Sequence, residues 1–272
     1  MAEQPGSDDG EPVVLVEVAE RVATVWLNRP ARRNALNRAL VRRLWEVVGT
    51  LDADDGVDVI ILTGTDPAFC AGVDLKEAAS ADGGLLSADM EMPERGLLPD
   101  LAKPVIGAVN GPTATGGLEL AMSCDLLIAS DRARFADTHS RVGVMPGGGM
   151  TVRLARWIGL PRAKQMSITG DYIDADTALR WGLVNEVVAH ADLLGRARLI
   201  AASVVSNDPR GVRTVLSMYD QGAATTENEA WPIEHTAARA WAADSRASGE
   251  ELDRRRAAVT DRGRRQLPTA AP

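Results

Sequence analysis

Hydrophobic and polar positions change their spacing along the chain, and this change distinguishes strands from helices. Residues 13–30, VVLVEVAERVATVWLNRP, alternate branched apolar residues with polar ones around a short turn. This alternation predicts a β-hairpin that ends at Pro30. The apolar residues that follow recur every three or four positions, which predicts an amphipathic helix. They are Leu36, Leu40, Leu44, Val47, Val48 and Leu51.

Three short apolar runs come next, and each is closed by glycine or a polar residue. They are VIILTG (59–64), PVIGAVNG (104–111) and LLIAS (126–130). Runs of this length and composition are typical of strands that are buried on both faces. Helical patterns, namely GGLELAMSC, GGMTVRLARWIG and DADTALRWGLV, lie between and after them. Strands that alternate with helices indicate an α/β protein.

Beyond about residue 190 the strand patterns stop, and the rest of the chain has the spacing of helices. The segment SNDPRG, which begins at Ser206, marks a junction. The first residues, MAEQPGSDDGEP, are acidic and lack the basic and apolar parts of a signal peptide. We therefore expect a disordered leader (1–11), an α/β core (12–206) and a helical C-terminal region (207–272).

The net charge and the cysteine content limit the kinds of binding partner and the cellular location that we expect for the protein. The net charge of −8 argues against a nucleic-acid or anionic-membrane partner. The apolar runs are far shorter than the ~20 residues of a membrane span. The arginines of DRRRAAVTDRGRR, from Asp253, either bind phosphate or form a solvated face, and we favour the solvated face. Cys70 and Cys124 lack metal-site spacing, so we expect no metal and a cytoplasmic location.

Two glycine-bearing turns each join a strand to a helix. In FCAGVDLKE (69–77), Gly72 allows a tight turn and Asp74 lies near the start of a helix. The second turn is NGPTATGGLELA (110–121). Together the two turns can direct two backbone N–H groups at one carbonyl oxygen, as an oxyanion hole does. A phosphate loop is the competing interpretation, but neither GxxxxGK[ST] nor GxGxxG occurs.

Glu119 follows the second turn and stands among leucine, alanine and methionine. A capping box would need Ser or Thr three residues earlier, where the chain has Gly116. The helix dipole favours a carboxylate there by only ~0.3–1 kcal/mol, which is small against the free energy of burying a charge. A role in acid–base chemistry is therefore the stronger interpretation.

Five segments, in order from about residue 13 to 190, resemble successive motifs of the enoyl-CoA hydratase/isomerase (crotonase) superfamily. They are NRPARRNALN, FCAGVDLKE, PVIGAVNGPTATGGLELAMSCDLLIAS, RVGVMPGGGMTVRLARWIG and ITGDYIDADTALRWGLVNEVV. The resemblance implies an α/β spiral of repeated β-β-α units and a helical C-terminal part that forms a homotrimer or a dimer of trimers. It also implies acyl-CoA thioester substrates and no metal or redox cofactor.

The same resemblance assigns roles to single residues. The backbone N–H groups of Val73 and Gly116 match those that polarise the thioester carbonyl, and Glu119 matches the glutamate that activates water. The residues that match the CoA- and substrate-binding positions are Arg32, Arg33, Ala35, Ala71, Asp74, Leu75 and Lys76.

The chain also departs from the family pattern. His139 stands where hydratases carry a second catalytic glutamate. Its imidazole either transfers a proton or only packs and bonds to a neighbour such as Asp137. Glycines 147–149 occupy the places of the aspartates of dienoyl-CoA isomerases and aryl-CoA dehalogenases, which argues against those activities. The C-terminal signature of many hydratases is replaced by GEELDRRRAAVTDRGRR.

We therefore expect an enoyl-CoA hydratase that adds water to a 2-enoyl-CoA, with Glu119 and His139 as the proton-transfer groups. A double-bond isomerase that uses Glu119 alone is one alternative. A non-catalytic acyl-CoA-binding protein is another. An RNA-binding family member is disfavoured by the acidic charge.

Overall fold

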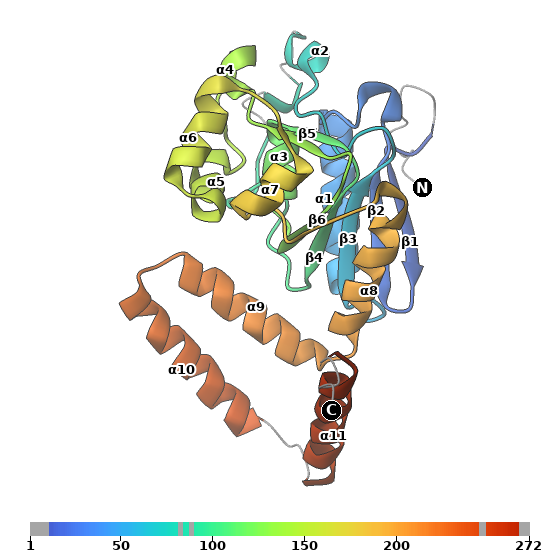
Figure 1. The fold of residues 1–272 in the computed structure, drawn as a ribbon, viewed down its shortest axis with the longest axis vertical. Coiled ribbons are helices and arrows are strands. Elements are labelled where there is room, and N and C mark those ends of the chain that lie inside the picture. Colours follow the sequence, from blue (N-terminus) through green and yellow to red (C-terminus); the bar gives the residue numbers. More distant parts are fainter. Residues whose placement is uncertain (1–10, 81–83, 87–89, 245–248, 267–272) are drawn as a thin grey trace, which may run out of the picture. The chain divides into compact units, whose positions relative to one another are not determined.

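The computed structural model describes residues 11–80, 84–86, 90–244 and 249–266, so nearly all of the predicted leader lies outside the described residues. The strands are β1 (Val14–Ala19), β2 (Val22–Leu27), β3 (Val59–Gly64), β4 (Val105–Val109), β5 (Pro112–Ala114), β6 (Leu126–Ser130), β7 (Arg134–Ala136), β8 (Ile173–Asp174) and β9 (Glu186–Val188) (Figure 1). The helices are α1 (Arg38–Ala53), α2 (Leu75–Ala78), α3 (Gly116–Ala121), α4 (His139–Val142), α5 (Met150–Ile158), α6 (Leu160–Thr169), α7 (Ala175–Trp181), α8 (Leu193–Val205), α9 (Pro209–Ala223), α10 (Glu227–Asp244) and α11 (Gly249–Gln266). Short 3-10 turns lie at Pro30–Arg32, Gly84–Leu86 and His190–Asp192.

The chain divides into two compact units, residues 1–216 and 217–272. The sequence-based boundary lies at 206/207, in the turn before α9, whereas the units divide within α9. In the second unit every described element is helical. In the part of the chain that the structure describes, no helix combines the length and the apolar character needed to cross a bilayer.

A six-stranded sheet forms the centre of the first unit, in the order β1-β2-β3-β4-β6-β9. The hairpin β1–β2 is antiparallel, as the alternation predicts, and the remaining pairs are parallel. Successive side chains of a strand point to opposite faces. Val59 and Ile61 of β3 therefore pack with α8, while Ile60 and Leu62 lie in the larger cluster with α1. Figure 1 shows α8 lying across the near face of these strands.

A smaller sheet, in the order β5-β7-β8, was not foreseen from the sequence. Its strands have only two or three residues, too few for an alternating pattern to be recognised. The parallel pair β5–β7 continues into a hydrogen bond of 3.0 Å from the Thr115 N–H to the Ala136 carbonyl. This pairing places the start of α3 beside the residues that lead into α4.

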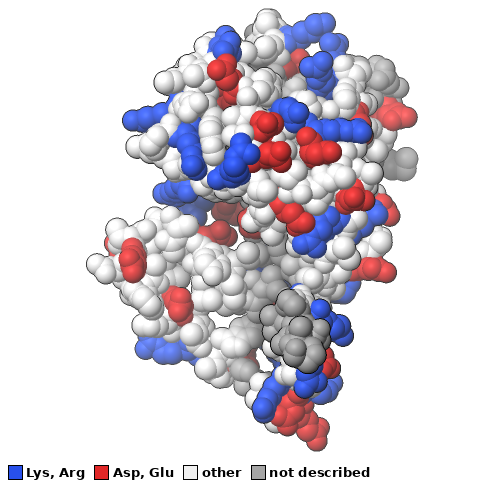
Figure 2. Space-filling view, viewed as in Figure 1, with Lys and Arg blue, Asp and Glu red and all other residues white. Residues whose placement is uncertain are grey.

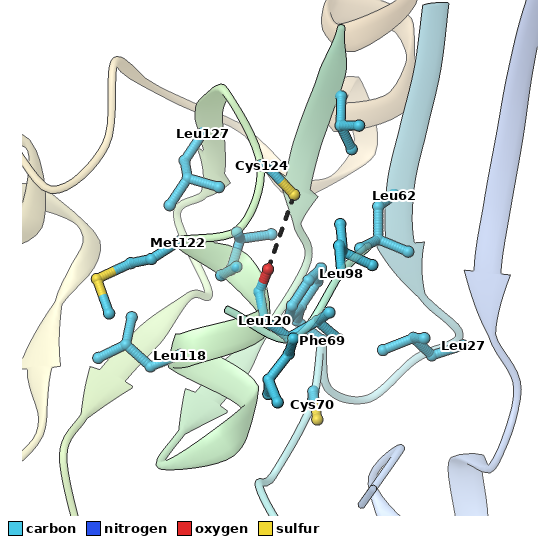
Figure 3. Packing of buried hydrophobic residues seen from close by; sticks show 14 of the residues in the cluster. Leu27, Leu62, Phe69, Cys70, Leu98, Leu118, Leu120, Met122, Cys124 and Leu127 are labelled. Carbon is cyan, nitrogen blue, oxygen red and sulfur yellow. Dashed lines mark hydrogen bonds between the residues drawn. The ribbon is translucent and has the colours of Figure 1, made fainter. Parts of the chain in front are cut away.

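Helix α3 is buried along its whole length. Leu118, Leu120 and Met122 pack in the larger apolar cluster together with Phe69 and Leu127 (Figure 3). The apolar residues on either side of Glu119 thus fix this helix in the core, and they fix the place of its carboxylate.

The two glycine-bearing turns pack backbone against backbone. A Cβ atom on Gly117 would lie 2.1 Å from the carbonyl oxygen of Cys70. Gly72 has a φ of +100°, and a Cβ there would lie 2.7 Å from Oγ1 of Thr115. Only residues without a side chain allow the first turn to approach α3 this closely.

A buried ion pair holds the first turn on its other side. Arg29 donates to Oδ2 of Asp74 at 3.0 Å and to the carbonyl of Ala35 at 2.6 Å. Oδ1 of Asp74 accepts from the Lys76 N–H at 3.2 Å and so caps α2. The side chains of Arg29 and Asp74 are 5% and 13% exposed, so this pair is well shielded from water. It ties the segment after β2 to the turn before α2.

Replacing Gly117 by alanine should destabilise the first unit, because neither the new Cβ nor the Cys70 carbonyl can rotate away. Overpacking of this kind costs about 1–3 kcal/mol or more. Gly195 of α8 is the matched control, since a Cβ there has no heavy atom within 4 Å. Gly195→Ala should raise the stability by roughly 0.5–1 kcal/mol. Urea unfolding measures both, and equal stability of the two variants would contradict the close backbone contact.

Replacing Asp74 by alanine should lower the stability by about 3 kcal/mol, because it removes the carboxylate that forms an ion pair with a buried guanidinium. Asp171 provides the control, because its pair with Arg141 is exposed on both sides. Asp171→Ala should leave the stability nearly unchanged. Thermal unfolding of both variants checks the difference. A small loss for Asp74→Ala would mean that the ion pair does not hold the turn.

Candidate active site

The first turn presents the backbone N–H of Val73. Leu36 N–H donates to the Gly72 carbonyl at 2.7 Å, and Asp74 N–H donates to the Leu36 carbonyl at 2.8 Å. These two bonds form a parallel bridge between Leu36 and Val73. In such a bridge the N–H of the central residue points away from the partner segment. The Val73 N–H is thus directed away from Leu36, and it donates to no other described residue.

The second turn presents the N–H of Gly116, the first residue of α3. Such an N–H has no partner within its own helix. A Cβ on Gly116 would lie 3.8 Å from the Val73 nitrogen, so the two turns meet at this point. Thr115 just before it has a φ of 53° and a ψ of −121°. This conformation is unfavourable for a residue with a side chain, and strain of this kind is concentrated at functional sites.

The positions predicted for CoA and substrate binding lie on two adjacent segments. The Ala71 N–H donates to the Arg33 carbonyl at 3.0 Å, which joins the turn after β2 to the turn before α2. Leu75 and the two arginines are exposed, as is Lys76, while the alanines and Asp74 are half-buried. The structure therefore brings together all seven: Arg32, Arg33, Ala35, Ala71, Asp74, Leu75 and Lys76. The carboxylate of Asp74 is already engaged with Arg29 and the α2 backbone.

Glu119 is buried, with 3% of its surface exposed. Its Oε1 accepts from the Gly148 N–H at 2.9 Å and from the Met150 N–H at 3.1 Å. Burial raises the pKa of Glu119 above its ordinary value, against the opposing effects of these N–H groups and of His139. One carboxylate oxygen is thus held in place, and the other, Oε2, is left to exchange a proton.

His139 faces that second oxygen. Its Nε2 lies 3.7 Å from Oε2 of Glu119. On the other side of the ring, Nδ1 lies 2.6 Å from Oδ1 of Asp137. All three residues are buried, with at most 5% of their surface exposed. The structure therefore places the two predicted proton-transfer residues together and adds a second carboxylate behind the imidazole.

The sequence analysis missed the groups that hold Glu119. Their signal is the run of glycines 147–149, which was considered only for the aspartates it lacks. A Cβ on Gly148 would lie 2.9 Å from Oε2 of Glu119 and 2.7 Å from Leu97, so the position has no room for a side chain. Asp137 was considered only as a neighbour of His139. Its position two residues earlier in the chain was the available signal.

The arrangement is suited to moving protons beside a polarised carbonyl group. A buried carboxylate and an imidazole face each other. Two N–H groups that no described residue engages lie close to them in the fold: that of Gly116 at the start of α3, and that of Val73 in the adjacent turn before α2. Nearby Cys70 is fully buried, and burial raises the pKa of its thiol to about 12, so it is a poor nucleophile. Among the described residues, no cluster of His, Cys, Asp and Glu is arranged to hold a metal ion.

Comparison with known proteins gives the same family as the motifs. The sequence pattern of the enoyl-CoA hydratase/isomerase family matches residues 17–252. The short-chain-enoyl-CoA hydratase of Clostridium acetobutylicum is 39% identical over 218 residues, which cover 77% of this chain and 81% of that protein. The probable peroxisomal enoyl-CoA hydratase 1 of Arabidopsis thaliana is 37% identical over 223 residues, or 81% of this chain and 83% of that protein.

A solved structure supports this assignment. The crystal structure of an enoyl-CoA hydratase from Mycobacterium avium is 49% identical in sequence and has a TM-score of 0.71. It covers 84% of this chain, and the match includes 96% of that chain. With the family pattern extending over most of the chain and with relatives of this similarity, the protein belongs to the enoyl-CoA hydratase/isomerase (crotonase) superfamily.

Proposed function

We propose that the protein is an enoyl-CoA hydratase, which adds water across the C2=C3 double bond of a 2-enoyl-CoA thioester. The observation that carries the proposal is the buried pair of Glu119 and His139. Its Oε2 and Nε2 atoms lie 3.7 Å apart, while Oε1 is fixed by two backbone N–H groups. The names of the relatives, which are themselves called enoyl-CoA hydratases, support the assignment.

In the proposed reaction Oε2 of Glu119 takes a proton from water, and the hydroxide oxygen bonds to C3. The π electrons of the double bond move toward the thioester, whose oxygen becomes an enolate. The N–H groups of Val73 and Gly116 stabilise this negative charge as it develops. Protonated His139 then gives the proton on Nε2 to C2, and the thioester carbonyl re-forms. The sum is the addition of one water molecule.

Binding of the CoA part is proposed for the two adjacent segments before α1 and α2. Arg32, Arg33 and Lys76 carry exposed cationic groups suited to phosphates. On the face of the first unit seen in Figure 2, acidic and basic side chains are interspersed, so such a local basic group can exist on an acidic protein. The proposed steps are proton transfers and polarisation by N–H groups, and they require neither a metal nor a redox cofactor.

A homotrimer or a dimer of trimers is proposed as the assembly. Large apolar side chains are exposed on α5, α6 and the segments flanking them, and others on α9 and α10. The first set comprises Met145, Val152, Leu160, Ile168 and Tyr172, and the second comprises Tyr219 and Trp231. Exposed apolar patches are typical of interfaces, so these side chains are candidates for contacts between subunits. The two free, buried cysteines support a cytoplasmic location, which we also propose.

The first test is activity on crotonyl-CoA and longer 2-enoyl-CoAs, followed as loss of the conjugated-thioester absorbance. Glu119→Gln should lower kcat by about 10²–10⁴-fold, because the amide cannot take a proton. The acyl-CoA affinity should stay unchanged, since the Gln carbonyl can still accept from Gly148 and Met150. Glu46→Gln, on an exposed side chain, is the control and should remain fully active.

Two other outcomes would replace the hydratase assignment. Conversion of 3-enoyl-CoA without hydration would identify a double-bond isomerase. Tight acyl-CoA binding with no turnover in any of these assays would identify a binding protein. Full hydratase activity in Glu119→Gln would remove Glu119 from the mechanism.

The pH dependence of kcat/KM should show the raised pKa of Glu119. The proposed base must be ionised, and burial raises its pKa above the ordinary 4.5. Activity should therefore fall with decreasing pH along an acid limb that lies above pH 4.5. Any residual activity of Glu119→Gln should lack this limb. A wild-type profile that stays flat down to pH 4.5 would mean that Glu119 is not the base.

A further inference from the structure

Asp137 is buried, and its Oδ1 accepts two hydrogen bonds from a single residue. The backbone N–H of His139 donates to it at 3.2 Å, and the imidazole Nδ1 lies 2.6 Å away. We propose that Asp137 is a positioning residue, which keeps a hydrogen on Nδ1 of His139 throughout turnover, so that Nε2, the nitrogen that faces Glu119, is the one that gives up and regains the proton and is bare in the neutral ring, which is then the Nδ1–H tautomer. This inference rests on the proposed hydratase function and deepens it.

The tautomer follows from what each atom can donate. Burial alone would raise the pKa of Asp137, but hydrogen bonds from the side chains of His139 and Ser167 outweigh it and lower that pKa. The carboxylate is therefore ionised and can only accept. At 2.6 Å the hydrogen must then lie on Nδ1. In the neutral imidazole the other nitrogen, Nε2, is left with a free lone pair.

This tautomer allows the site to return to its starting state. After one turnover Glu119 holds the proton taken from water, and His139 has lost the proton given to C2. Oε2 and Nε2 then face each other at 3.7 Å, one with a proton and one with a lone pair. Once these two atoms approach to hydrogen-bond distance, the proton passes from Oε2 to Nε2, which restores an ionised Glu119 and a protonated His139. In the opposite tautomer Nε2 would already carry a hydrogen and could not accept it.

The backbone contact alone does not explain this geometry. An aspartate that only caps a short helix needs to accept hydrogen bonds from backbone N–H groups. Asp174 does so when it accepts from the Thr177 N–H at 2.8 Å. Asp137 does this and also holds the ring nitrogen that points away from Glu119. Asp174→Asn is therefore the matched control for the loss of a capping carboxylate.

The experiment compares four proteins: wild type, Asp137→Asn, His139→Gln and the double variant. Asp137→Asn should lower kcat at least about tenfold, toward the 10²–10⁴-fold contribution of general acid–base catalysis, with KM unchanged. In the His139→Gln background the same change should cause no further loss, because Asp137 acts through the imidazole. Asp174→Asn should leave kcat unchanged. Equal melting temperatures would show that the variants fold.

Nitrogen-15 NMR of the imidazoles shows which nitrogen of the neutral ring carries the hydrogen, and it requires no substrate. The chain has three histidines, and the His139→Gln spectrum identifies the signals of His139. We expect the neutral ring of the wild type to carry its hydrogen on Nδ1, and this preference to be lost in Asp137→Asn.

The outcomes separate the two proposals. A wild type that is inactive on every enoyl-CoA but shows the Nδ1–H tautomer would refute the hydratase function and keep the positioning role. A neutral wild-type ring with its only hydrogen on Nε2 would refute the positioning role, whatever the activity. An active enzyme would also refute it if Asp137→Asn kept full kcat, or if the losses in the double variant were additive.

Discussion

The contact on which the site depends is the close approach of two backbone segments, the turn at Cys70 and the start of α3. Gly117 lies against the Cys70 carbonyl, and there is no space for a methyl group between them. Interiors are close-packed, so a shift of either segment would propagate into the side chains around them. The same approach brings the backbone of Val73 toward Gly116. The relative position of the two N–H groups is thus a property of the core packing and does not depend on mobile side chains.

Three ionisable groups, Glu119, His139 and Asp137, lie next to one another in the interior beside this contact. Each is stabilised by different partners. Glu119 is held by the N–H groups of Gly148 and Met150, Asp137 by His139 and Ser167, and His139 by the carboxylate of Asp137. Burying such groups is unfavourable unless their hydrogen bonds are satisfied. In the described part of the chain, no buried side-chain nitrogen or oxygen is left without a partner. The network is therefore compatible with a stable fold while one carboxylate keeps a raised pKa.

Much of the fold could be predicted from local patterns. The runs 59–64 and 126–130 match β3 and β6, because strands that are buried on both faces are apolar throughout. The helix predicted from Leu36 to Leu51 matches α1 from Leu40 onward, and its apolar residues there are buried. Leu36 precedes α1, which begins at Arg38, and forms a parallel bridge with Val73 instead. Strands β5, β7 and β8 could not be predicted, because their pairing is set by tertiary contacts over very few residues. The local spacing of apolar residues does not depend on such contacts, so it cannot predict them.

Two residues of the candidate site, Glu119 and His139, were singled out from the sequence, but their geometry and the contacts that hold them were not. Glu119 stood out as a carboxylate in an apolar run, and His139 as a departure from the family pattern. Their separation of 3.7 Å is set by tertiary contacts, among them the pairing of β7 with β5. The roles of Val73, Gly116 and the CoA-binding positions remain predictions.

This separation also has a stereochemical consequence. A flat double bond that is placed against Oε2 of Glu119 and Nε2 of His139 has both atoms on one side of its plane, because they are only 3.7 Å apart. The hydroxyl group would then reach C3, and the hydrogen C2, from the same face. In heavy water, the deuterium at C2 of the product would consequently have a single configuration relative to the hydroxyl group.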